Sequence, residues 1–595
     1  MCGIVACRSS RPALNFLLPA LAQLEYRGYD SAGIAVASEA GEPVRLRSVG
    51  RLANLAKLVA GYEGPALDGV GIGHTRWATH GPATEANAHP HGDCTGELFV
   101  VHNGIIENAE RLRSELVAAG HRFTSDVDSE VVAHLVEAEI AAGASSTAEA
   151  VQQALTRLTG SWALAVLRRG ERAVVVTARH SPLLVAETLE GAFAASDVTA
   201  MAGVADQVEP LEDGDIVELT DDGLRWMRAD STSNRVSKRL TGPPPTILEL
   251  ADAPDFMAKE IEQQPAVAAD LVARYVNEVP NGRLWAGLDL PPLTRVRFLA
   301  CGTSLHAAQV LARVLASAGI PSSLAPASEA DALVTEPDTL TVALSQSGET
   351  ADVLRVLDRR YGPVLALTNS PLSTLARTAD AVIDLAAGVE VGVAATKTFT
   401  AQVIAGTAVM LSGLVSAGRM TSRDGTGFAA ELAELPAELA LAHELARGPA
   451  AKLAEDLIDR RGFLFVARGS AVPYAAEGAL KLKEISYCWA EHYAAGELKH
   501  GPIALLERGT PVVVVDNGHS KLAGNVAEIA ARGARVISVG GLEAALPYRV
   551  GPSADVPWGP LSAVIPQQHL ARELAVALGR DVDKPRNLAK SVTVE

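Results

Sequence analysis

The pattern of apolar and polar positions divides the chain into regions of two kinds. Up to about residue 220, short apolar runs alternate with turns, most clearly at 32–37 and 98–102. The runs 163–166 and 173–176 flank Arg168-Arg169-Gly170 and predict a hairpin. We expect two helical stretches, of which 130–142 has one apolar face. This mixture predicts an α+β sandwich.

A polar stretch at 221–245, ending in three prolines, is expected to be a linker. A helical pattern resumes at 256–277. The predicted divisions are a first domain at 2–220, a linker and connecting helix at 221–282, two further domains at 283–425 and 452–585, and a C-terminal tail at 586–595.

The later part of the chain repeats one alternating β/α unit. Strand, turn and helix are expected at 296–300, 301–304 and 306–318, and again at 463–466, 468–470 and 474–485. Further strands are expected at 340–344 and 364–367, and at 511–515 and 536–539. Alternating strands and helices predict parallel sheets covered on both faces, which bind ligands at the carboxyl ends of their strands.

Composition narrows the class of protein. The chain has 595 residues, 48% of them apolar, and a formal charge of -18, which is unlike a protein that tracks nucleic-acid phosphates. Five scattered cysteines indicate a reducing cytosol, with neither a disulfide framework nor a zinc ribbon. No signal peptide is expected, because Arg8, Arg11 and Pro12 interrupt the start before an apolar core can form. The uncharged run 399–418 is interpreted as a buried helix, not a membrane span.

The start of the chain offers a nucleophile. Once Met1 is removed, Cys2 carries both a thiol and an α-amine that can take the thiol's proton. The alternative is that position 2 is merely a small residue. Arg76 could bind a carboxylate, Asn103-Gly104 could form an oxyanion hole, and Asp126 or Asp128 could hold an ammonium group. Five histidines also occur here, at 74, 80, 89, 91 and 102, but without acids or cysteines at ligand spacing no metal is expected.

The repeated units offer a sugar-phosphate site. The hydroxyl-rich turns at 303–304 and 345–350 suit a monophosphate, although ordinary helix caps would look alike. Glu477, Lys481 and Glu484 share one helix face, either as a solvated salt-bridged surface or as a base beside a cation. His500 lies in a predicted turn and could open a sugar ring. Lys590 lies in an apolar C-terminal tail and could form a Schiff base, or the tail could be a docked strand.

Together these motifs resemble the glutamine–fructose-6-phosphate aminotransferase (isomerising) family from end to end. The resemblance rests on eight segments in order: 1–5, 24–31, 75–81, 102–108, 345–350, 477–487, 497–502 and 584–595. The family joins an N-terminal-nucleophile hydrolase sandwich to two doubly wound sugar isomerase (SIS) domains, and this is the fold we expect.

The resemblance implies a glutaminase in the first region. Cys2 would attack the glutamine side-chain amide with its own amine as base, so the active chain should lack Met1. Asn103 and Gly104 would stabilise the oxyanion. The residues expected to bind glutamine are Arg76 at its carboxylate, Asp128 at its ammonium, Arg27 and His80 along the pocket, and Trp77 as the gate of an ammonia channel.

The resemblance also implies an isomerase that makes glucosamine-6-phosphate, the first step of amino-sugar synthesis. Lys590 would form a Schiff base with the C2 ketone, Glu484 would move a proton from C1 to C2 with Lys481 and Glu477 assisting, and His500 would reach in from a partner subunit. The residues expected to hold the sugar phosphate are Cys301, Gly302, Thr303, Ser304, Ser345, Gln346, Ser347, Thr350, Val393 and Ala589. Glutamine and fructose-6-phosphate would be the substrates of a cytoplasmic homodimer that needs no cofactor or metal and binds neither nucleic acid nor membrane.

Two positions depart from the family pattern: Ala6 replaces the more frequent Gly, and Ala395 replaces a common Ser beside Val393. A paralogue that aminates another keto-sugar phosphate would share every named residue. A sugar-phosphate-binding regulator would have no need of Glu484, His500 and Lys590. A plain isomerase or deglycase would have no use for Cys2 and Asn103-Gly104.

Overall fold

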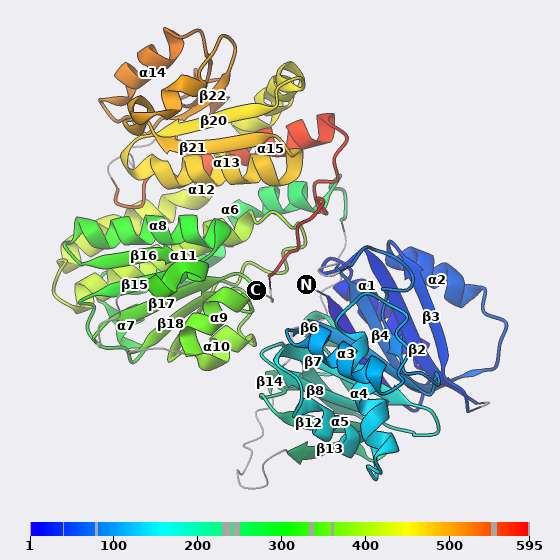
Figure 1. Ribbon diagram of the computed structural model, residues 1–595. Coiled ribbons are helices and arrows are strands. Elements are labelled where there is room, and N and C mark those ends of the chain that lie inside the picture. Colours follow the sequence, from blue (N-terminus) through cyan, green and yellow to red (C-terminus); the bar gives the residue numbers. More distant parts are fainter. Residues whose placement is uncertain are drawn as a thin grey trace. The chain divides into compact units, whose positions relative to one another are not determined.

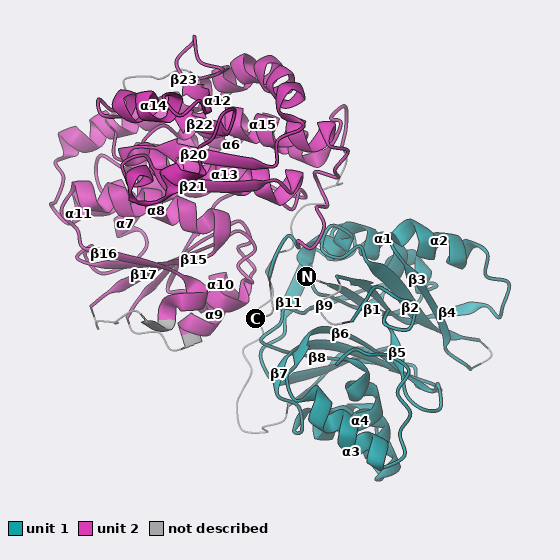
Figure 2. Ribbon diagram, turned by 45° about the horizontal axis from the view of Figure 1, so that its top comes forward, with its two compact units in different colours: residues 1–249, 589–595 teal, residues 250–588 magenta. Residues whose placement is uncertain are grey.

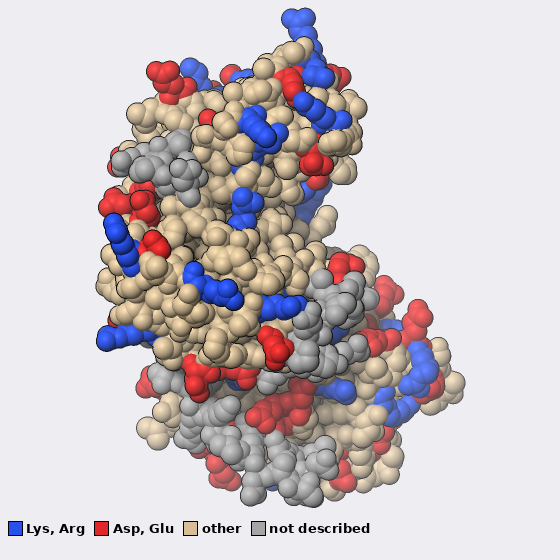
Figure 3. Space-filling view, turned by 90° about the vertical axis from the view of Figure 1, so that its left-hand side faces the viewer, with Lys and Arg blue, Asp and Glu red and all other residues tan. Residues whose placement is uncertain are grey.

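The computed structural model describes residues 2–39, 41–77, 81–228, 240–241, 250–332, 338–358, 362–548 and 556–592. The chain divides into two compact units, residues 1–249 with 589–595 and residues 250–588 (Figure 2). Each unit has hydrophobic cores of its own. On the face drawn in Figure 3, Lys and Arg are interspersed with Asp and Glu, and its described residues form no continuous basic stripe.

The first unit is built on two antiparallel sheets. One has the order β14 (Leu240–Thr241), β11 (Gln207–Pro210), β9 (Leu184–Thr188), β10 (Gly191–Ala195), β1 (Gly3–Ser9), β4 (Leu67–Arg76), β2 (Ser31–Ser38) and β3 (Val44–Val49). The other has the order β13 (Gly223–Arg228), β12 (Asp215–Thr220), β8 (Val174–Arg179), β7 (Gly160–Arg168), β6 (Leu98–Ile106) and β5 (His91–Gly92).

These sheets pack face to face, because alternate apolar residues such as Ile4 and Ile72 of one meet Val101 and Ala165 of the other in a single core. Helices α1 (Leu14–Leu24) and α2 (Leu52–Ala60) pack on the first sheet, and α3 (Ala109–Ala118), α4 (Glu130–Ala141) and α5 (Thr147–Leu155) lie on the second (Figure 1). The predicted α+β sandwich and the hairpin of β7 and β8 are confirmed.

Two expectations for this unit are wrong. It has five α-helices among its described residues, not two. Helix α1 illustrates why helices are hard to recognise in this region: it is apolar at most positions and contains Pro19, so its period is hidden. The expected linker contains strand β13, which pairs with β12, and Leu224 and Trp226 pack against the core. The rest of that linker, 229–239 and 242–249, lies outside the described residues.

The second unit contains two five-stranded parallel sheets, as predicted. The first has the order β16 (Ser322–Pro326), β15 (Val296–Ala300), β17 (Leu340–Ser345), β18 (Val364–Thr368) and β19 (Ala381–Asp384). The second has the order β21 (Trp489–Ala494), β20 (Gly462–Ala467), β22 (Pro511–Val515), β23 (Arg535–Gly540) and β24 (Leu546–Pro547). Central strands such as β22 are buried throughout, which explains their continuous apolar runs.

Helices cover both sheets, and one core extends through both halves of the unit (Figure 1). The helices are α6 (Phe256–Tyr275), α7 (Arg283–Ala286), α8 (Gly302–Ser317), α9 (Ala351–Asp358), α10 (Thr374–Thr378), α11 (Lys397–Ser416), α12 (Ser422–Leu457), α13 (Val472–Ser486), α14 (Leu522–Ala530) and α15 (Val564–Ala577). Helix α11 is long and apolar enough to cross a membrane, but 94% of its most apolar window is buried inside the structure. It is therefore a core helix of this unit.

Candidate active sites

Cys2 lies beside the end of strand β4. Strands β1 and β4 pair antiparallel with Gly3 opposite Thr75, and this register places Cys2 next to Trp77. The Trp77 backbone N–H donates to Cys2 Sγ at 3.3 Å. Burial raises the pKa of the Cys2 thiol, while the chain's α-ammonium, the Trp77 N–H and Arg76 act in the opposite direction. A thiol in this setting needs a nearby base to become a nucleophile.

Asn103 faces the same cysteine in a fixed orientation. Its Nδ2 donates to the Cys2 carbonyl at 3.0 Å, and its Oδ1 lies 3.0 Å from His74 Nε2. His74 Nε2 also lies 3.1 Å from the His102 carbonyl, and because both partners are acceptors, this nitrogen carries the proton. Burial lowers the pKa of His74 to about 3, so the ring is neutral. His74, which the sequence analysis considered only as a metal ligand, thus directs the Asn103 amide group toward Cys2.

Gly104, next to Asn103, adopts a backbone conformation that other residues avoid. Its φ is +131°, and a Cβ atom there would lie 2.1 Å from the Ser161 carbonyl oxygen of β7. Only glycine therefore fits beside this strand. The Asn103-Gly104 pair keeps the geometry that an oxyanion hole requires, an amide side chain next to an unobstructed backbone.

The predicted glutamine-binding residues are partly assembled. Burial lowers the pKa of Arg76, while Cys2, Asp30 and Asp128 act to raise it, so Arg76 and Asp128 are within electrostatic reach of each other. Asp128 Oδ2 accepts the Ile106 N–H at 2.8 Å, which ties it to the strand of Asn103. Arg27 forms a buried ion pair with Asp197, a partner that the sequence analysis missed. His80 lies outside the described residues.

The other histidines of this region stack on one another. The rings of His74 and His89 are 4.1 Å apart, and those of His89 and His91 are 4.4 Å apart. Burial lowers the pKa of His91 to about 3 and that of His89 well below its usual value. These rings are neutral at physiological pH and pack as buried side chains next to His74.

In the second unit, the two hydroxyl-rich turns lie at the ends of adjacent strands. Helix α8 begins at Gly302, earlier than expected, so Thr303 and Ser304 lie in its first turn. Ser304 Oγ accepts from Gln402 Nε2 of α11 at 2.8 Å. In the other turn, Ser345 Oγ lies 2.8 Å from Thr350 Oγ1 and accepts the Gly348 N–H at 3.0 Å. These contacts fix hydroxyl groups at two adjacent strand ends, as phosphate binding requires.

Helix α13 brings a buried charge network to the same strand ends. Lys481 Nζ lies 3.3 Å from Glu477 Oε1 and 2.7 Å from Glu484 Oε2, and it donates to Thr303 Oγ1 at 2.9 Å. Lys481 and Glu477 are fully buried, whereas the Glu484 side chain is 20% exposed. The predicted helix face is therefore a buried network joined to the predicted phosphate turn, not a solvated surface.

Within this network Lys481 stays protonated. Burial alone would lower its pKa, but the Glu477 and Glu484 carboxylates outweigh burial and hold the pKa above its usual range. His306 of α8 also contacts Glu477, with Nδ1 2.7 Å from Oε2, and was not predicted from the sequence. The arrangement leaves Glu484 as the network's one partly exposed carboxylate.

Other predicted isomerase residues are not brought together within one unit. Val393 is tied through its N–H to the Asp583 carbonyl at 3.1 Å. His500 is exposed and ends the 3₁₀ turn η5 (Glu497–His500). Ala589 and Lys590 group with the first unit, whereas Glu484 belongs to the second. The roles of Lys590 and His500 remain predictions.

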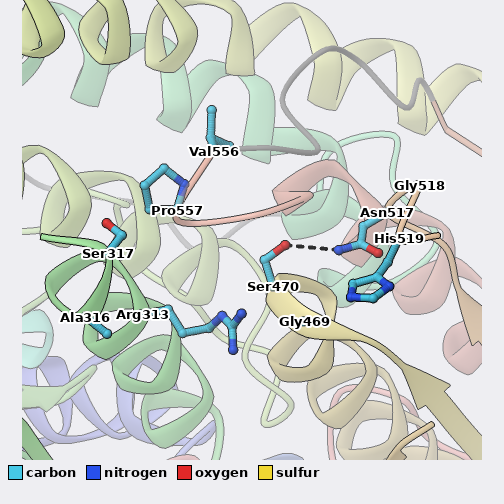
Figure 4. Close-up of a pocket in the computed structure, with 10 residues that line it drawn as sticks. All are labelled: Arg313, Ala316, Ser317, Gly469, Ser470, Asn517, Gly518, His519, Val556 and Pro557. Atoms are coloured by element: carbon cyan, nitrogen blue, oxygen red, sulfur yellow. Dashed lines mark hydrogen bonds between the residues drawn. The ribbon is translucent and has the colours of Figure 1, made fainter. Parts of the chain in front are cut away.

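A pocket of about 540 Å³ lies at the equivalent strand ends of the second sheet (Figure 4). There Asn517 Nδ2 donates to Ser470 Oγ at 3.1 Å, and Arg313 of α8 faces the two residues. The lining residues are Arg313, Ala316, Ser317, Gly469, Ser470, Asn517, Gly518, His519, Val556 and Pro557.

Comparison with known proteins agrees with this architecture. A glutamine amidotransferase domain model matches residues 74–203, and a SIS domain model matches residues 293–412 and 456–544. The C-terminal domain of glucosamine-fructose-6-phosphate aminotransferase from Francisella tularensis superposes with a TM-score of 0.51 and 30% identity, covering 57% of this chain and 100% of that one.

Curated proteins match over the full length. Glutamine--fructose-6-phosphate aminotransferase [isomerizing] of Bradyrhizobium diazoefficiens is 40% identical over 624 residues, and that of Thermosynechococcus vestitus is 41% identical over 636 residues. Both alignments cover 100% of this chain and 100% of the relative. The chain belongs to the glutamine–fructose-6-phosphate aminotransferase (isomerising) family.

Proposed function

We propose that this enzyme transfers the side-chain amide nitrogen of glutamine to fructose-6-phosphate and releases glutamate and glucosamine-6-phosphate. The observation that carries the proposal is the buried network of Thr303, Glu477, Lys481 and Glu484 at a hydroxyl-rich strand end. It occurs on the same chain as a cysteine held between Trp77 and Asn103. Full-length relatives named glutamine–fructose-6-phosphate aminotransferase support this assignment.

In the proposed glutaminase, the α-amine of Cys2, freed by loss of Met1, takes the thiol proton. The thiolate attacks the amide carbon of glutamine, and the negative charge on the carbonyl oxygen is stabilised by Asn103 Nδ2–H and the Gly104 N–H. The ammonium formed at the base protonates the leaving nitrogen, so ammonia departs and a glutamyl thioester remains. Water then hydrolyses the thioester to glutamate. Arg76 and Asp128 hold the carboxylate and ammonium of glutamine, and Arg27 and His80 line the pocket.

In the proposed isomerase, backbone N–H groups and hydroxyls at 301–304 and 345–350 hold the phosphate. His500 of the partner subunit assists ring opening, and Lys590 condenses with the C2 ketone and releases water. Ammonia then displaces the lysine. Glu484 takes a proton from C1 and returns it to C2, and Lys481 keeps Glu484 ionised and in place. Val393 and Ala589 contact the sugar. We place this homodimeric enzyme in the cytoplasm, acting on small substrates and not on nucleic acid or membranes.

A Cys2→Ala variant tests the division into two centres. It should lose glutamine-dependent synthesis, because the nucleophile is gone, while synthesis from added ammonium persists within about threefold. Enzyme assays with each nitrogen donor measure both outcomes. Equal loss of both activities would refute the two-centre assignment.

Because Ala395 lies close to the predicted sugar contact Val393, an amination assay with a panel of keto-sugar phosphates accompanies this test. Preference for fructose-6-phosphate supports the proposal. Preference for another keto-sugar phosphate would instead identify a paralogue with a specialised substrate.

A further inference from the structure

Four side chains that neither centre uses converge at one edge of the first unit. Cys94 lies in the turn between β5 and β6, His121 follows α3, and His134 and Glu137 lie one helical turn apart on α4. Each offers one ligand atom, and the four atoms lie within 4.8 Å of one another. Elements α3 and α4 and the strands β5 and β6 that position them lie side by side in Figure 2.

We propose that Cys94, His121, His134 and Glu137 form a structural zinc site. The ligand set is one thiolate, two imidazoles and one carboxylate, all of which Zn²⁺ binds in proteins. The two negative charges of Cys94 and Glu137 balance the charge of the ion, since the imidazoles bind in their neutral form. Four protein ligands close the coordination shell, as in structural zinc sites, and leave no position for a reactive water.

The two sulfur–nitrogen distances in the cluster match those around a tetrahedral zinc ion. With Zn–S near 2.3 Å and Zn–N near 2.0–2.1 Å, a tetrahedral angle separates sulfur and nitrogen by about 3.6 Å. Cys94 Sγ lies 3.7 Å from His121 Nδ1 and 3.5 Å from His134 Nδ1. Glu137 Oε2 lies 2.8 Å from His121 Nδ1 and 3.0 Å from His134 Nδ1, somewhat less than the roughly 3.3 Å that shared coordination would give.

The surrounding groups hold these ligands in place. His134 is fully buried, and its Nε2 points toward Glu130 Oε1 at 3.8 Å, which leaves Nδ1 for the metal. Glu130 is in turn fixed by the backbone and hydroxyl groups of Thr124 and Ser125. The Arg122 N–H donates to Cys94 Sγ at 3.3 Å. Outer contacts of this kind orient the ligands of metal sites.

Binding would replace protons with the ion. The Cys94 thiol proton would leave, and each imidazole would bind through Nδ1 in its neutral form, with its one proton on Nε2. The ion would then tie the 93–97 turn to α4. Because α4 starts directly after Asp128 and Ser129, and Ser129 Oγ lies 2.8 Å from His102 Nδ1, the clamp would fix the helix that adjoins the Asn103 strand.

Cobalt titration of the tag-free full-length chain, stripped of metal with a chelator, tests the proposal. One equivalent of Co²⁺ should give the visible bands of four-coordinate cobalt and a thiolate-to-cobalt charge-transfer band, and Zn²⁺ should bleach both. Cys94→Ser should lose the charge-transfer band, and Glu137→Gln should weaken Zn²⁺ binding by more than the roughly 10–100-fold that loss of an outer partner costs.

Two control variants keep the result specific. Cys2→Ala removes the partly buried thiol of the glutaminase site and should keep the cobalt spectrum. His180→Gln removes an exposed histidine of the same unit that pairs with Asp213, and should also keep it. Absence of a stoichiometric cobalt complex, or an unchanged charge-transfer band in Cys94→Ser, would overturn the site and leave a hydrogen-bonded cluster around Glu137. Loss of glutaminase activity alone would bear on the proposed function and not on this site.

Discussion

The two halves of the second unit share one scaffold but carry different chemistry. Their sheets have matching strand orders, and Gly302 and Gly469 stand at the same place with φ of +53° and +57°. Helix α13 of the second half reaches the strand ends of the first, and α8 of the first half reaches those of the second. The two helices occupy equivalent positions. Among the residues that the structure describes, however, a buried carboxylate–lysine network occurs at the strand ends of the first half and not at those of the second.

The turns that follow the equivalent strands β17 and β22 also carry different side chains. After β17, Ser345 Oγ accepts the Gly348 N–H, whereas after β22 the Asp516 carboxylate accepts the Gly518 N–H. A carboxylate repels a phosphate where a hydroxyl can donate to it. The parallel scaffold therefore presents different chemical groups at the two sets of strand ends.

The largest expected effect is on the first half. Glu484→Gln should lower amino-sugar synthesis by about 10²–10⁴-fold from either glutamine or ammonium, because a general base is lost. Glutaminase activity should remain. Glu491→Gln, an exposed carboxylate that pairs with Lys483, is the matched control and should retain synthesis. Steady-state assays of amino-sugar synthesis measure the effect. Full activity of Glu484→Gln would show that Glu484 is not the general base.

Lys481→Met should destabilise the second unit by about 3–5 kcal/mol, because Glu477 would remain buried without the lysine ammonium 3.3 Å away. Urea unfolding monitored by circular dichroism measures the change. A stability within about 1 kcal/mol of the parent would mean that the network contributes little to the fold.

Gly302→Ala and Gly469→Ala form a matched pair. Each should cost about 1–2 kcal/mol of stability, because each places a Cβ atom in the left-handed region. Neither Cβ would meet an atom closer than 3.5 Å, so any further effect reflects the ligand site. Only Gly302→Ala should raise KM for fructose-6-phosphate. Equal changes in KM for the two variants would contradict the assignment of the fructose-6-phosphate site to the first half.

The smallest effect is expected at the second pocket. Arg313→Met keeps the aliphatic stem and removes the charge, and kcat/KM for synthesis should stay within about twofold because no catalytic step is assigned there. The same assays measure it. A loss of tenfold or more would show that the second strand ends contribute to turnover.

Most of the central strands of the second unit could be predicted from the sequence. Strands β15, β17, β18, β20 and β22 were located to within about a residue, because buried parallel strands are continuous apolar runs bounded by turns. Edge strands such as β16 and β21 were missed, since they are partly exposed and carry polar residues. Helix α12, of 36 residues, was missed because Pro436 and Pro449 resemble breaks.

The sites were less accessible to sequence reasoning. The helix face of Glu477, Lys481 and Glu484 follows from its spacing, but its contact with Thr303 spans 174 residues in sequence and depends on how α8 and α13 pack. His306 and Asp197 had no signal of their own for the same reason. The cluster around Cys94 was not predicted, because its four residues come from three separate segments of the chain. Only His134 and Glu137, at i and i+3 on a predicted helix, could have been paired from the sequence.

One measurement tests the central claim most directly, that a single chain joins glutamine hydrolysis to sugar-phosphate amination. The processed full-length enzyme is incubated with fructose-6-phosphate, glutamine isotopically labelled at its side-chain amide nitrogen, and excess unlabelled ammonium, and the products are analysed by mass spectrometry. We predict glucosamine-6-phosphate that carries the label at C2, together with glutamate. Glutamate without any amino-sugar phosphate, or an amino sugar that carries only unlabelled nitrogen, would contradict the account.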